Sequence, residues 1–198
     1  MIEITEVPDG ATITLVANVN SFRSSLNGFQ QYSTLPGSRW GVSLSWTNRK
    51  GRGASRLQAQ LSSLLGPVGI FKIRIPDYKR YGTALGTGKV VSATVGSSLI
   101  GTNGWTPSQP LLLAAGDWIE INQQAYRVTE DVASAANGTA SIKVTPPVRR
   151  PATAGQSVIV DNPSFYLRLT NSSGAEFALT PAAGSPIYAV GVDALEID

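Results

Sequence analysis

Apolar and polar residues alternate along most of the chain, in short runs separated by glycine, proline, asparagine and serine. Successive side chains of a β-strand point to opposite faces, so this alternation is typical of strands with one buried face. The clearest run covers residues 40–46, in which Trp40 and Trp46 share a face with Val42 and Leu44. The same pattern predicts strands over residues 13–19, 71–75, 89–95, 118–121, 125–128, 140–144, 165–169, 174–179 and 188–196.

One stretch has helical spacing. Leucines at positions 57, 61, 64 and 65 form a single apolar stripe and predict an amphipathic helix over residues 54–65. Ser55 is a candidate N-cap. Gly66-Pro67 is a strong stop signal, because glycine tolerates the left-handed position after a helix and proline cannot continue one. The basic segment 49–53 leads into this helix, which lies between the strands 40–46 and 71–75.

The middle of the chain has turn signals but no helical spacing. Asn122-Gln123-Gln124 separates two alternating runs and predicts a β-hairpin. Asn137-Gly138 is a second turn, and Pro146-Pro147 ends the strand that follows it. Residues 89–150 are therefore interpreted as a small strand-only module, and the whole chain as a mostly β protein with one helix.

Composition excludes several kinds of chemistry. The 198 residues suit one domain, or a compact domain that carries a second small one. The absence of cysteine and histidine excludes thiolate and imidazole metal sites, cysteine nucleophiles and histidine-based triads. The close carboxylate groupings in mid-chain, residues 117–120 and 130–131, fit turn and strand positions better than a catalytic pair. The glycine-rich segments 86–88 and 101–104 open no helix and do not resemble phosphate loops. We expect no enzyme activity, no cofactor and no metal.

The sequence shows neither a membrane span nor a signal peptide. No run of 18 apolar residues is present, and residues 1–6 are acidic rather than basic. We expect a soluble protein that is made in the cytoplasm and has no membrane partner.

Charge is sparse and unevenly distributed. Charged residues make up 15% of the chain, against roughly 25% in an average protein. Asp77 is the only acidic residue within 23–89, which holds most of the lysines and arginines, whereas residues 171–198 contain acids and no base. Three interpretations stay open: nucleic-acid binding, complementarity between copies of the chain, or a solvated face without a role. The chain lacks a helix-turn-helix, a metal finger and an aromatic RNA-binding strand, so we expect no sequence-specific nucleic-acid partner.

Low charge also favours assembly, because interface cores are depleted of charge and enriched in aromatic residues and arginine. The alternation assigns Trp40 and Trp46 to a core. Trp105 lies in a Gly-Trp-Thr-Pro segment, which fits either a core or an exposed contact.

Four segments, taken in order, resemble the distal tail proteins of long-tailed, siphovirus-type bacteriophages. They are Leu35-Pro36-Gly37-Ser38-Arg39-Trp40; the helix end Leu64-Leu65-Gly66 with the strand that follows; residues 112–128; and Gly138–Val144 with Pro146-Pro147-Val148-Arg149. Together they cover residues 35–150. The resemblance rests on their order, since no single motif is specific. Val148 stands where such proteins often have leucine.

The resemblance implies a non-enzymatic virion protein. It would form a homo-oligomeric ring, expected to be a hexamer, at the tail tip, where it joins the tail tube protein to the tail hub, the tape-measure protein and the receptor-binding parts. The implied fold is a β-sandwich-like ring domain with one amphipathic helix, residues 1–85 and 151–198, carrying an inserted β-barrel-like module, residues 86–150. The expected subunit-interface residues are Arg39, Trp40, Trp46, Arg49, Lys50, Arg52, Arg56, Trp105, Tyr188, Asp193 and Glu196.

Two other functions stay open. One is a different β-rich tail ring protein, such as a tail terminator, a tube-like subunit or a head-tail connector. The other is a carbohydrate-binding tail module, in which Trp105 would present its ring to a sugar.

Overall fold

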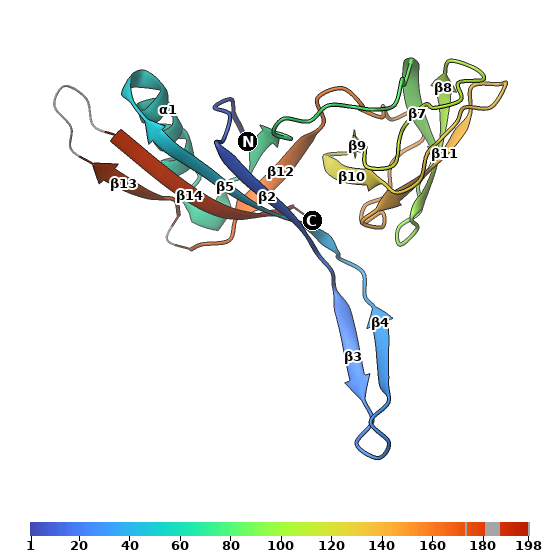
Figure 1. Cartoon of the computed structure of the whole chain (residues 1–198), viewed down its shortest axis with the longest axis horizontal. Helices are drawn as coiled ribbons and strands as arrows, with labels where there is room; N and C mark the ends of the chain where they lie inside the picture. Colours follow the sequence, from blue (N-terminus) through green and yellow to red (C-terminus); the bar gives the residue numbers. More distant parts are fainter. Residues whose placement is uncertain (173, 181–186, 198) are drawn as a thin grey trace.

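The computed structural model describes residues 1–172, 174–180 and 187–197. Strands dominate this part of the chain, and α1 (Gly51–Ser62) is its one α-helix, so the expectation of a mostly β fold with a single helix is confirmed. Figure 1 shows two bodies of sheet and a long two-stranded projection below them. We call the body that carries α1 the main domain, the other the inserted module, and the projection the arm.

The main domain is built on a seven-stranded sheet that joins the two ends of the chain. Its strand order is β1-β6-β12-β14-β5-β2, and β13 pairs with β14 beside this path. The strands are β1 (Ile2–Ile4), β2 (Gly10–Val16), β5 (Arg39–Arg49), β6 (Phe71–Arg74), β12 (Ser164–Leu169), β13 (Glu176–Thr180) and β14 (Ile187–Glu196).

The predicted alternation in β5 is confirmed. Trp40, Val42, Leu44 and Trp46 are all buried, and they pack into one core with strands β6, β12 and β14 and with the helix. Residues with this spacing all point to the same face of a strand, which is why the sequence identified the face correctly.

The helix starts and ends differently from the prediction. It begins at Gly51, so the segment 51–53 is helical and Ser55 lies inside the helix rather than at its N-cap. Leu57, Leu61 and Leu64 are buried, as the stripe predicts, but Leu65 is exposed. Leu65 adopts a left-handed conformation just after the helix, which rotates its side chain off the stripe.

The inserted module has its own sheet and its own core. The strand order is β7-β8-β11-β10-β9, with β7 (Gly86–Ser92), β8 (Leu99–Trp105), β9 (Trp118–Ile121), β10 (Gln124–Val128) and β11 (Ala140–Thr145). The predicted hairpin is β9–β10, and its turn has two residues, Asn122 and Gln123, both with positive φ. Such turns match the twist of the strands they join.

The module reaches beyond the expected boundaries at 86 and 150. Its core includes Ala84 on one side and Val158 and Val160 on the other. The Val158 amide donates to the Gly88 carbonyl at 2.8 Å, and residues 120 and 159 form a further bridge. The chain therefore stays with the module until about residue 160 before it returns to the main sheet at β12.

The arm is the largest element that the sequence analysis missed. The strand predicted over residues 13–19 is interrupted: β2 ends at Val16, and the chain then forms β3 (Val19–Arg23) and β4 (Gln30–Thr34), an antiparallel pair on its own. The arm extends away from both bodies of sheet (Figure 1). Its polar residues give no clear alternation, and its aromatic residues lie on both faces, so periodicity could not reveal it.

Two leucines near the end of α1 provide a matched test of the packing. Leu61 is 1% exposed and Leu65 is 74% exposed. Leu61→Ala should lower the free energy of unfolding by about 2–5 kcal/mol, because it leaves a cavity in the main core. Leu65→Ala should change it by less than about 0.5 kcal/mol. Urea denaturation measures both, and equal losses would contradict the helix orientation described above.

Candidate assembly surface

Three of the expected interface residues are tryptophans that the chain itself encloses. Trp40, Trp46 and Trp105 are all buried. Their indole N–H groups donate within the chain, from Trp40 to the Ala125 carbonyl at 3.0 Å, from Trp46 to the Glu6 carbonyl at 3.2 Å and from Trp105 to the Thr102 hydroxyl at 2.8 Å. The expectation that these rings contact another subunit is wrong, because each ring is buried within its own chain and donates a hydrogen bond there.

Glu196 is also wrong as a subunit contact, since it holds the two bodies of the protein together. Its carboxylate is fully buried and accepts the Ala125 amide of the inserted module at 2.6 Å. The Arg149 guanidinium forms an ion pair with the other carboxylate oxygen and donates to the Ile197 carbonyl. A buried carboxylate is tolerated only with such partners.

An aromatic contact reinforces this junction. The Trp40 ring of the main domain meets the Trp118 ring of the module edge-on at 4.8 Å between centroids, and Trp118 meets Phe165 at 5.4 Å. The hydroxyl of Tyr78 both accepts from the Trp118 amide and donates to its carbonyl, and burial raises the pKa of Tyr78 to about 12. The junction is therefore packed and hydrogen-bonded rather than a flexible linker.

The remaining expected residues lie at or near the surface. Lys50, Arg52 and Arg56 are exposed around the start of α1, and Asp193 is exposed on β14. Arg49 is paired with Asp9 at 2.8 Å within the chain, whereas Arg39 and Tyr188 are partly buried. Complementarity between the basic residues of α1 and an acidic face of another copy stays a prediction.

The surface that the sequence analysis missed covers β2 and the arm, residues 11–38. Arg23 is the only charged residue in this stretch, although nearly all of it is exposed. The exposed fractions are 67% for Phe22, 96% for Leu26, 75% for Phe29 and 64% for Tyr32. Exposed surface is ordinarily rich in charge, and uncharged aromatic surface is typical of interface cores. The sequence signal for this surface is the near absence of charged residues between positions 11 and 38.

Exposed aromatic side chains lie on both faces of the arm. The strand register sets Tyr32 opposite Ser21 and Phe22 opposite Gln31, so the two rings lie on opposite faces. At the root of the arm, Asn18 donates to Ser38 and to the Pro36 carbonyl. A hairpin of two strands is at best marginally stable in water on its own, and within the described residues β3 and β4 pair only with each other.

The edge of the main sheet continues the same surface. Strand β2 pairs with β5 and with no other strand of the described residues, which leaves the hydrogen-bonding groups of its outer edge open. Leu15 and Val16 are exposed beside this edge. An open edge with apolar side chains is a template for pairing with a further strand. We refer to residues 11–38 as the assembly surface.

The carboxylates considered for catalysis have structural partners. Asp117 accepts the amides of Tyr81, Gly82 and Ala114, and Glu120 accepts the Ser164 amide and the Tyr166 hydroxyl. Within the described ranges, three or more acidic side chains are nowhere grouped as metal ligands would be, and the helix found there is too short to span a bilayer.

Compared with models of known protein families and with curated protein sequences, the chain matches none.

Burial raises the pKa of Glu196 to about 7 from an ordinary 4.5, against the opposing effects of Arg149 and the Ala125 amide. Between pH 4.5 and about pH 7, Glu196 therefore keeps its proton in the folded state and loses it in the unfolded state. The free energy of unfolding should therefore fall as pH rises from about 4.5 to about 7, and the Glu196 contribution should level off above that.

Glu196→Gln should remove this part of the pH dependence. Urea denaturation of both proteins across the window measures the difference between their slopes. A slope that is unchanged in Glu196→Gln would show that Glu196 titrates normally.

Proposed function

We propose that this protein is a structural ring subunit of a bacteriophage tail tip, which joins the tail tube to the hub and the receptor-binding parts. The observation that carries the proposal is the assembly surface: 28 consecutive residues, 11–38, are mostly exposed and hold a single charge. Such a surface is costly for a monomer and favourable for a protein that is always covered by neighbours. The resemblance of residues 35–150 to distal tail proteins suggests that the assembly is a ring at the tail tip.

The geometry of the surface favours a closed ring. The arm extends away from both bodies of sheet, so a neighbouring copy that covered it with its main sheet or its inserted module would make a heterologous contact. Heterologous contacts form rings when the rotation between neighbours closes. The order of the ring, expected to be six, follows from the resemblance alone.

The free energy of burying the arm suggests that each copy would need a second contact with its neighbour besides the arm. Covering an aromatic or leucine side chain contributes ~1.5–3 kcal/mol, so the four large side chains of the arm would contribute ~6–12 kcal/mol. Association itself costs ~4–15 kcal/mol in lost freedom of motion. The arm alone is therefore about balanced, and the open edge of β2 would add the surplus that makes the assembly stable.

Of the other functions, a different β-rich tail ring protein uses the same surface and differs only in its position in the particle. The carbohydrate-binding alternative loses its main support, because the ring of Trp105 is buried against Gly88 and cannot stack on a sugar.

Phe22→Ser combined with Phe29→Ser should abolish assembly without unfolding the chain, because the two rings lie on an arm that contributes nothing to either core. Light scattering of the purified wild type should give the mass of a closed oligomer, and the double variant should give the mass of one chain. Val68→Ser, which changes an equally exposed apolar residue after α1, serves as the matched control and should assemble normally. A wild type that remains monomeric at every concentration and does not associate with phage tails would overturn the proposal.

A further inference from the structure

The dipeptide Asn-Gly occurs three times in the chain, at residues 27–28, 103–104 and 137–138. Asparagine is chemically labile in this setting, because the backbone nitrogen of the following residue can attack its side-chain amide carbon. Glycine has no side chain to hinder the approach and gives the backbone the freedom that the attack requires. The fold therefore decides which of the three pairs reacts.

The second and third pairs are held firmly in the inserted module. Asn103 lies within β8, which pairs with both β7 and β11. The backbone around both glycines is closely packed: a Cβ atom added to Gly104 would overlap the Thr87 carbonyl, and one added to Gly138 would overlap the carbonyl of the buried Trp105. Either pair gains freedom only when part of the module opens.

The first pair lies at the tip of the arm. Asn27 and Gly28 are both exposed, and apart from the chain neighbours no atom lies within 4 Å of the place that a Cβ of Gly28 would take. The Gly28 amide donates to the Ser24 carbonyl at 3.1 Å, and the Phe29 amide donates to Oδ1 of Asn27 at 3.2 Å. Both hydrogen bonds belong to the turn itself, and no residue of the arm is part of either core.

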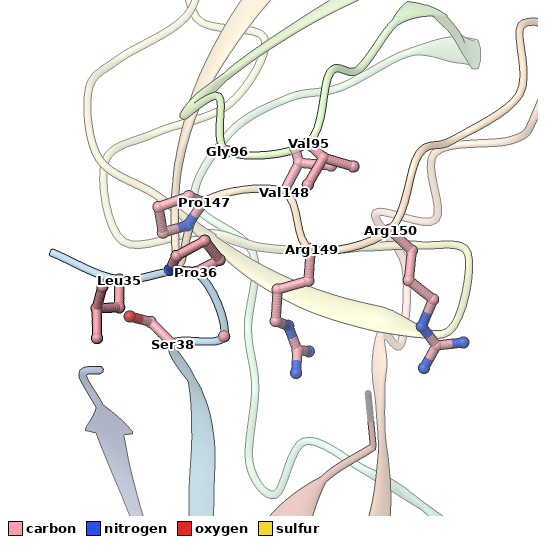
Figure 2. Close-up of a pocket in the computed structure, with 10 residues that line it drawn as sticks. Leu35, Pro36, Ser38, Val95, Gly96, Pro147, Val148, Arg149 and Arg150 are labelled. Carbon is pink, nitrogen blue, oxygen red and sulfur yellow. The ribbon is translucent and has the colours of Figure 1, made fainter. Parts of the chain in front are cut away.

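The arm is held at its root and not at its tip. At the root, Pro36 borders a pocket together with Pro147 of the module (Figure 2), and its carbonyl accepts the Asn18 side chain. Further out, β3 and β4 pair only with each other within the described residues. Such a hairpin opens locally at a far lower free energy than a core does. Each opening frees the Gly28 nitrogen and the Asn27 side chain.

We propose that Asn27, unlike the asparagines of the other two pairs, is a site of spontaneous deamidation in the folded protein. The Gly28 nitrogen forms a bond to Cγ of Asn27 and gives up its proton, and the side-chain nitrogen leaves as ammonia. Water then opens the resulting succinimide ring at either carbonyl, which leaves aspartate or isoaspartate at position 27. The product places a carboxylate within residues 24–38, which hold no charge.

Peptide mapping by mass spectrometry, during incubation of the folded protein in mildly alkaline buffer, measures the conversion at each site. Asn27 should react at least about tenfold faster than Asn103 or Asn137, a ratio that corresponds to ~1.4 kcal/mol in the preceding opening step. Asn20 is exposed on the same arm but precedes Ser21, so it should stay unchanged and serves as the control for the requirement for glycine.

Unfolded protein provides the control for the sequence alone. In urea concentrated enough to unfold the chain, the three Asn-Gly pairs should react at similar rates, because all have the same freedom. The proposal is overturned if Asn27 of the folded protein stays unconverted or reacts no faster than Asn103 and Asn137. It is equally overturned if Asn27 leads by the same factor in urea, since the flanking sequence would then set the difference.

The consequence for assembly rests on the proposed function. A carboxylate at position 27 should weaken the contact between copies, because covering an unpaired charge is costly. Light scattering at equal concentration should therefore show weaker assembly of Asn27→Asp than of Asn27→Gln, which keeps an amide and should match the wild type. Equal assembly of the two variants would overturn this consequence. A wild type that stays monomeric would instead count against the proposed function, and the conversion at Asn27 would be unaffected.

Discussion

The pairing of β6 with β12 is the constraint on which the rest of the structure depends. Ile73 of β6 lies opposite Phe165 of β12, so the chain leaves the main sheet and returns to it at neighbouring positions. The intervening residues can therefore form a separate module without disturbing the sheet, because the two ends of the insertion are held side by side. Both strands are buried in the main core, which fixes these ends firmly.

The same constraint brings the junction residues together. Once the insertion is anchored at β6 and β12, the Trp118 ring of the module meets the rings of Trp40 and Phe165 of the main domain edge-on, and the Ala125 amide donates to Glu196. The final described strand is thereby tied to the module as well as to its own sheet. Burying a carboxylate there restricts how the two bodies can be arranged, at a cost in desolvation that Arg149 offsets in part.

Charge is distributed unevenly over the described surface. The basic residues Arg52 and Arg56 of α1 are exposed and solvated, whereas residues 11–38 are mostly exposed and carry a single charge, that of Arg23.

The sequence by itself determined much of the local structure in which one face is buried, although strand β8 (Leu99–Trp105) was missed. The alternation around Trp40 and Trp46 predicted strand β5, and the leucine spacing predicted the helix, because burial of one face imposes a period on the residues. The segment Asn122-Gln123-Gln124 predicted the module hairpin, although Gln124 belongs to strand β10. The sequence could not determine the arm, whose exposed faces impose no period, nor the roles of Trp105 and Glu196. These depend on residues far away in the chain: Glu196 is buried because Ala125 and Arg149 meet it, and only the tertiary structure brings those groups together.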